Sequence, residues 1–198
     1  MYLPRHFAQD DPAALQSLMR AHPLATLVHG AGDALTAEHV PLEYDADAGV
    51  LRGHVARANP VWREADGQVV LAVFHGPQAY VSPSWYPSKA EHHKVVPTWN
   101  YAVVHARGRL KAVDDADWLR ALVGRLTAGQ ESARPAPWSV DDAPPDFLQQ
   151  MLRAIVGIEI AVEQLQGKWK MSQNRAEADR HGVIAGLGDD PAAGWIPR

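Results

Sequence analysis

Short stretches of alternating apolar and polar residues, each ended by a turn signal, constrain the fold of this chain more than any other feature. Alternation with a period of two predicts a β-strand that is buried on one face. Residues 30–33 and 45–49 place glycine and aspartate between such stretches, a pattern typical of hairpins. The segments predicted as strands are 24–29, 35–44, 50–56, 68–75, 80–81, 94–113 and 155–165. Pro41 indicates that its strand lies at a sheet edge or contains a bulge.

Helices are expected at both ends of the chain and after the long strand. The first begins at Pro12 behind a capping aspartate (Asp10 or Asp11) and ends before Pro23. Residues 114–115 cap a second helix, whose apolar residues recur at helical spacing. Shorter helices are predicted at 60–65, 146–153 and 174–185, and proline-rich loops at 82–91 and 135–145.

This order of elements predicts a mainly β, α+β fold, namely an antiparallel barrel with helical additions. A length of 198 residues suits a single domain spanning 1–198. Strands and helices alternate too rarely for a doubly wound sheet. The sequence contains no Gly-x-Gly-x-x-Gly or Walker motif, which argues against classical dinucleotide and nucleoside-triphosphate sites.

The charge and composition of the chain limit the classes of partner and the cellular location that we expect. Nineteen Lys and Arg face 23 Asp and Glu, a net charge of −4, so direct DNA binding is doubtful, because it usually draws on a basic surplus. The chain has no cysteine, no membrane-length apolar run and no signal-peptide pattern at its start. We therefore expect a cytoplasmic protein without a membrane partner.

Residues 52–60 form the first candidate site. On a strand, Arg52, His54 and Ala56 face the same way, and Gly53 permits close approach of another backbone or a planar ligand. Arg57 follows at the strand end, beside a helix N-terminus. A cation, an imidazole and free N–H groups so placed could hold a phosphate. The alternative is the solvated face of an edge strand.

Two further segments carry candidate binding residues. Six of the 15 aromatic residues lie between Phe74 and Tyr101, interleaved with a proline-rich loop, which suits a flat ring ligand, a protein interface or an ordinary core hairpin. Residues 167–175 (GKWKMSQNR) are dense in hydrogen-bond donors. They could meet a phosphate or a partner's carboxylates, or they could simply cap the last helix.

The sequence gives little support for a metal site or a serine-hydrolase site. Ten histidines are present, but no His-Glu-x-x-His motif occurs, and the adjacent His92 and His93 would point to opposite sides of an extended segment. No Gly-x-Ser-x-Gly nucleophile elbow occurs either. We therefore expect no metal site and name no catalytic residue.

Taken together, these segments resemble the PaiB-type family of FMN-binding negative transcriptional regulators, which have the FMN-binding split-barrel fold. The resemblance spans nearly the whole chain and is specific for the family. It rests on residues 1–7, 20–27, 38–42, 52–60, 74–89, 96–101 and 167–175.

The resemblance implies a homodimer that holds FMN in grooves between two barrels. The phosphate would meet the stretch from His54 to Asn59, with Arg57 as its main partner. The flavin ring would lie along Trp85 or Trp99, and residues 168–175 would close the site from the partner subunit. The implied cofactor-binding residues are His54, Arg57, Asn59, Ser82, Trp85, Trp99, Asn100, Lys168, Lys170, Gln173 and Arg175. The turn at residues 57–59 lacks the Ser-Arg-Lys signature of the pyridoxamine-phosphate oxidase branch. The substrates of that branch are therefore not expected for this chain.

Two functional classes follow from the resemblance, and a third is more distant. The first is a flavin-binding regulator that acts through its flavin or a partner protein, since no segment resembles a helix-turn-helix. The second is an FMN-dependent oxidoreductase, because fold does not fix function. The third is a haem-binding split barrel, with His54 or His75 as an axial ligand.

Overall fold

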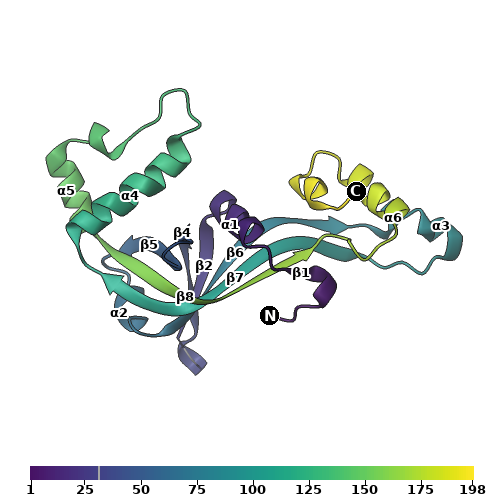
Figure 1. Cartoon of the computed structure of the whole chain (residues 1–198), viewed down its shortest axis with the longest axis horizontal. Helices are drawn as coiled ribbons and strands as arrows, with labels where there is room; N and C mark the ends of the chain where they lie inside the picture. Colours follow the sequence, from purple (N-terminus) through teal and green to yellow (C-terminus); the bar gives the residue numbers. More distant parts are fainter. Residues whose placement is uncertain (31) are drawn as a thin grey trace. The chain divides into compact units, whose positions relative to one another are not determined.

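The computed structural model describes residues 1–30 and 32–198 (Figure 1). Its contacts group the chain into two compact units. Unit 1 contains residues 1–22, 74–105 and 166–198, and unit 2 contains residues 23–73 and 106–165. Three long strands contribute residues to both units. The turn predicted at residues 30–33 includes residue 31, which lies outside the described residues.

The strands of the described residues form one eight-stranded sheet in the order β3-β2-β6-β7-β8-β5-β4, and β1 pairs with β8. All pairings for which the register is defined are antiparallel, as the sequence predicted. The strands are β1 (Ala8–Gln9), β2 (Leu24–His29), β3 (Thr36–Pro41), β4 (Glu43–Asp45), β5 (Val50–Ala56), β6 (Val69–Val81), β7 (Thr98–Val113) and β8 (Ile155–Lys170). Pro41 ends an edge strand, as expected for a residue without an N–H.

Six α-helices and five 3₁₀ turns accompany the sheet in the described part of the chain. The helices are α1 (Pro12–Ala21), α2 (Val61–Glu64), α3 (Ser88–His92), α4 (Ala116–Glu131), α5 (Pro145–Arg153) and α6 (Glu177–Leu187). The 3₁₀ turns are η1 (Arg5–Phe7), η2 (Gly32–Ala34), η3 (Pro83–Trp85), η4 (Val140–Asp142) and η5 (Pro191–Trp195). No helix among these residues is both long and apolar enough to cross a membrane.

Several boundaries differ from the sequence prediction. The predicted strands 68–75 and 80–81 are one strand, β6, because Gly76 does not begin a turn. Its missing side chain lets α1 pack closely: a Cβ there would lie 2.8 Å from Leu18 Cδ1. The predicted strand 35–44 divides into β3 and β4, and strand 155–165 continues to Lys170. The loop predicted at 82–91 contains η3 and most of α3.

Unit 2 brings the two ends of the sheet order together. β3, the first strand of that order, contacts β5, which is the last but one. The contact depends on Gly53, because a Cβ at that position would lie 2.7 Å from Pro41 O and 2.6 Å from Leu42 Cδ2. The close approach expected at Gly53 is therefore that of another backbone. Fully buried Leu27, Leu51 and Ile158 fill the space inside.

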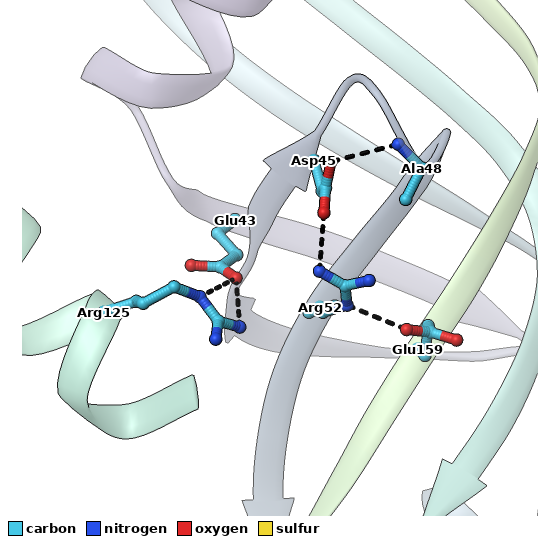
Figure 2. A network of polar contacts seen from close by, with 6 residues as sticks. All are labelled: Glu43, Asp45, Ala48, Arg52, Arg125 and Glu159. Atoms are coloured by element: carbon cyan, nitrogen blue, oxygen red, sulfur yellow. Dashed lines mark hydrogen bonds and ion pairs between the residues drawn. The ribbon is translucent and has the colours of Figure 1, made fainter. Parts of the chain in front are cut away.

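Two sets of ion pairs hold α4 in unit 2. Arg125 on α4 donates to Glu43 Oε1 on β4 at 2.8 and 2.6 Å. Next to it, Arg52 on β5 donates to Asp45 at 2.7 Å and to Glu159 on β8 at 2.8 Å (Figure 2). The Ala48 N–H and the Arg52 guanidinium together hold the pKa of Asp45 below its usual range. The second set joins Arg57 to Asp114, which lies just before the first residue of α4.

In unit 1, α6 packs on η3 and η5. Gly186 on α6 lies directly against the ring of Trp85, since a Cβ there would be 2.3 Å from that ring. Asp179, also on α6 and only 5% exposed, accepts hydrogen bonds from Ser88 N (3.1 Å) and Ser88 Oγ (2.8 Å). This carboxylate joins α6 to the first residue of α3.

Candidate functional site

A cluster of three cations lies at the end of β8 and in the turn after it. Lys168 and Lys170 are two residues apart on the strand, so they face the same side. Lys168 Nζ donates to the carbonyl of Tyr2 at 3.0 Å, and Lys170 Nζ donates to Thr98 Oγ1 and to the carbonyl of Trp99. These acceptors are neutral. None of the ion pairs found among the described residues includes Lys168, Lys170 or Arg175. We call these three residues the cation cluster.

The electrostatics of Lys170 reflect this lack of carboxylates. Burial lowers the pKa of its ammonium group, and the positive charges of Lys168 and Arg175 lower it further. Both effects disfavour the charged form. A bound anion would relieve the repulsion and supply the missing counter-charge. The cluster is therefore suited to a phosphate or carboxylate group.

Aromatic rings surround the cation cluster. Lys168 Nζ lies 5.4 Å from the ring centroid of Tyr101, and Arg175 Cζ lies 4.8 Å from that of Tyr86, both within cation–π range. Trp99, whose carbonyl accepts from Lys170, is 55% exposed and meets Tyr80 edge to face at 6.0 Å. An exposed aromatic surface beside unpaired cations can stack a planar ring and bind an anion attached to it.

The turn after β8 is held by side chains that the sequence singled out as ligands. Asn100 Nδ2 donates to Ser172 Oγ at 3.0 Å, and both residues are buried. Ser172 has a positive φ of 60°, a conformation that a non-glycine residue rarely adopts. Gln173 Oε1 accepts from Met171 N, and its Nε2 donates to the carbonyl of Trp169. Asn100 and Gln173 therefore shape the turn that carries Arg175.

Ser82 and Trp85 have local partners as well. Ser82 Oγ accepts from Ser84 N at 3.2 Å and caps η3. The Trp85 ring is half-buried against Gly186, whereas Trp99 exposes more than half of its surface. Of the two tryptophans expected to contact a flavin ring, Trp99 presents the more open surface.

The other predicted ligands, His54, Arg57 and Asn59, lie in unit 2. Asn59 Oδ1 accepts from Val61 N at 2.9 Å at the start of α2. His54 is in register with Gly157 on β8, and the ring of Trp118 on α4 would lie 2.3 Å from a Cβ at Gly157. Burial lowers the pKa of the His54 imidazole, which favours its neutral form. The eight remaining predicted ligands all lie in unit 1.

Arg57 is engaged with its own chain. Its guanidinium makes a two-pronged pair with Asp114 at 2.7 and 2.6 Å and donates to the carbonyls of Arg153 (2.7 Å) and Ile155 (3.0 Å). These bonds join the end of β5 to the residue before the α4 cap and to the start of β8. Asp115 caps α4 by accepting from Trp118 N at 2.8 Å, so Asp114 has the separate role of neutralising Arg57.

An Arg57→Ala variant is expected to melt a few degrees below the parent at pH 7, because it loses four hydrogen bonds. The difference should shrink in acid. Arg57 lowers the pKa of Asp114 from its ordinary value of 3.8, so the pair stabilises the fold above that pH and loses its effect as the pH falls through the lowered pKa. Thermal melts from pH 7 to pH 2 measure this. An unchanged Tm at pH 7 would contradict it, and Lys111→Ala, at an exposed strand position, is the control.

Sequence reasoning missed several residues that build these sites. Thr98 and the carbonyl of Tyr2 bind the lysines of the cation cluster, and Asp179 anchors α3. The segment 167–175 had indicated where a cation cluster would lie. No sequence signal pairs Asp179 with Ser88, since the two are 91 residues apart.

Comparison with known protein families shows which family the chain belongs to. Residues 1–164 match the family described as "Putative FMN-binding domain". The chain belongs to this family. A relative from Bacillus subtilis, "Protease synthase and sporulation protein PAI 2", is 34% identical over 94% of this chain and 89% of its own length. The resemblance to PaiB-type proteins is thereby confirmed.

Solved structures confirm the fold class. The flavocytochrome Anf3 from Azotobacter vinelandii covers 85% of this chain and 72% of its own, with a TM-score of 0.66 and 12% identity. The FAD- and haem-binding protein from Mycobacterium smegmatis covers 90% of this chain and 80% of its own, with a TM-score of 0.62 and 15% identity. At such identities the likeness concerns the fold alone.

Proposed function

We propose that the chain binds FMN, with the phosphate at the cation cluster and the isoalloxazine ring along Trp99. The observation that carries the proposal is a set of three cations, Lys168, Lys170 and Arg175, that form no ion pair in the described part of the chain and lie beside an exposed aromatic surface. FMN ends in one phosphate, which one compact cluster can neutralise. FAD carries a pyrophosphate and an adenosine that would need further partners. When bound, FMN supplies redox chemistry, while the protein positions it and sets its electrostatics.

The proposed ligands differ from the expectation that Arg57 is the main phosphate partner. Asp114 already neutralises Arg57, so a phosphate would have to displace a carboxylate there. At the cation cluster the competing acceptors are neutral oxygens of Tyr2, Thr98 and Trp99. Displacing the existing acceptors to bind a phosphate therefore costs less free energy at the cation cluster than at Arg57.

One relative also supports a regulatory role. The Bacillus relative is called "Protease synthase and sporulation protein PAI 2", and we propose that this chain acts as a regulator, through its flavin or a partner protein. The homodimer and the cytoplasmic location stay predictions.

Titrations with FMN, FAD and riboflavin, followed by flavin fluorescence, test the proposed site. We expect FMN to bind more tightly than FAD, and more tightly than riboflavin, which lacks the phosphate. Lys170→Gln and Arg175→Gln should each weaken FMN binding about ten- to hundredfold, since a charge-assisted hydrogen bond is worth about 1.5–3 kcal/mol. Both variants should bind riboflavin like the parent.

The matched control is Lys111→Gln, which removes an exposed cation on β7 outside the cluster. Its FMN affinity should equal that of the parent. Circular dichroism confirms that each variant is folded. Equal affinity for FMN and FAD, or equal FMN affinity in the parent and both cluster variants, would overturn the proposal.

A further inference from the structure

A cavity of about 650 Å³ lies in unit 2 between α4 and α5. Its floor is apolar: Leu119 on α4 and Leu152 on α5 are buried, and Leu148 is half-buried beside them. The volume is within the range of about 300–1,000 Å³ that is typical of small-molecule sites. All of its lining residues belong to unit 2, and none of them belongs to the cation cluster.

Some of the charged residues on the rim of this cavity have ion-pair partners and others do not. Arg57 is neutralised by Asp114, and Arg120 pairs with Asp141 at 2.5 Å. Arg153, at the end of α5, also lines the cavity, and its side chain has no ion-pair partner among residues 1–30 and 32–198. Asp117 is a rim carboxylate that has no ion pair among the residues that the structure describes, and it lies in the first turn of α4, where the helix dipole stabilises it.

We propose that this cavity binds a small amphipathic carboxylate. The apolar body of the ligand would lie on Leu119, Leu148 and Leu152. Its carboxylate would pair with the guanidinium of Arg153, whose planar donors match a carboxylate in two-pronged geometry. A neutral or cationic ligand would leave Arg153 without a counter-charge.

The helix that forms one wall of this cavity is fixed before any ligand arrives. The Arg57–Asp114 pair holds the segment that leads into α4, and the Arg125–Glu43 pair ties its second half to β4 (Figure 2). Because the wall is in place, a ligand does not have to order it, and this lowers the cost of binding. The cavity therefore has the properties of a preformed site rather than a gap that closes on binding.

Octanoate is the probe, with octanamide as its neutral counterpart. We expect isothermal titration to show octanoate binding at least about tenfold more tightly than octanamide. Amide chemical-shift changes in ¹⁵N–¹H spectra should concentrate in α4 and α5. Arg153→Gln should weaken octanoate about tenfold and leave octanamide unchanged. The Arg153 carbonyl, which accepts from Arg57, is retained in this variant.

Leu148→Glu adds a negative charge to the floor and should abolish octanoate binding in a protein that still folds by circular dichroism. Arg20→Gln removes an exposed arginine on α1 in unit 1 and should bind octanoate like the parent. Three results would overturn the proposal: octanamide binding as tightly as octanoate, unchanged octanoate affinity in Arg153→Gln, or shift changes centred outside α4 and α5. The outcome does not depend on whether the cation cluster binds a flavin.

Discussion

Gly53→Ala is expected to lower the free energy of unfolding by about 1–3 kcal/mol, the usual cost of forcing an extra carbon into a packed interior. In a chain of this length the loss corresponds to about 2–12 °C in Tm. The reason is geometric. The added Cβ would lie 2.7 Å from Pro41 O, and a carbonyl of an edge strand can move away only by opening the contact between β3 and β5. Gly53→Val should cost more, because it adds two further carbons.

Chemical and thermal unfolding of the two variants measures this effect. Gly129→Ala on α4 is the matched control, since a Cβ placed there would meet no described atom within 4 Å apart from its chain neighbours and the helix's own backbone. Alanine is also the better helix former, so that variant should be as stable as the parent or slightly more stable. A Gly53→Ala protein with the parent's Tm would show that β3 and β5 need not approach so closely.

Asp179→Ala should destabilise the protein by about 3 kcal/mol, the upper end for a hydrogen bond to a charged group. The buried carboxylate accepts two hydrogen bonds from one residue, Ser88. Its removal leaves the Ser88 N–H at the start of α3 without this acceptor. Urea unfolding of Asp179→Ala, Ser88→Ala and the double variant separates the pairwise contribution from the rest.

We expect the two single substitutions to be strongly non-additive, since each breaks the bond between the two side chains. Asp179→Asn should be milder, because the amide keeps an oxygen that can accept from Ser88 N. Simple additivity in the double variant would contradict the pairing. Glu177→Ala, at the exposed start of α6, tests whether any lost carboxylate in this helix has the same effect.

The positions of strands followed from local signals, because alternation and turn residues act over a few neighbours. β2 and β5 begin and end where the sequence predicted them. Gly76 and Pro77 misled the prediction. They usually mark a turn, but here the strand continues, since α1 packs against the glycine. A contact between distant segments overrode the local preference, and single-sequence patterns contain no information about such contacts.

The same limit applies to the candidate sites. The spacing of residues 167–175 shows that cations gather there, but only the folded chain shows that their acceptors are neutral. Arg57 has the residue type and the strand-end position expected of a phosphate ligand. Its partner Asp114, 57 residues away, could not be recognised, because as a helix-capping candidate it was indistinguishable from Asp115.

The pairing of β5 with β8 has a consequence for how the chain is made. Arg52 and its partner Glu159 are 107 residues apart. At synthesis rates of about 5–20 residues per second, β5 waits roughly 5–20 s before that neighbour exists. During this interval one edge of β5 is unpaired, and its apolar residues Leu51 and Val55 lack the cover that β8 later gives them. The nascent protein therefore passes through a stage in which aggregation or chaperone capture competes with closure of the sheet.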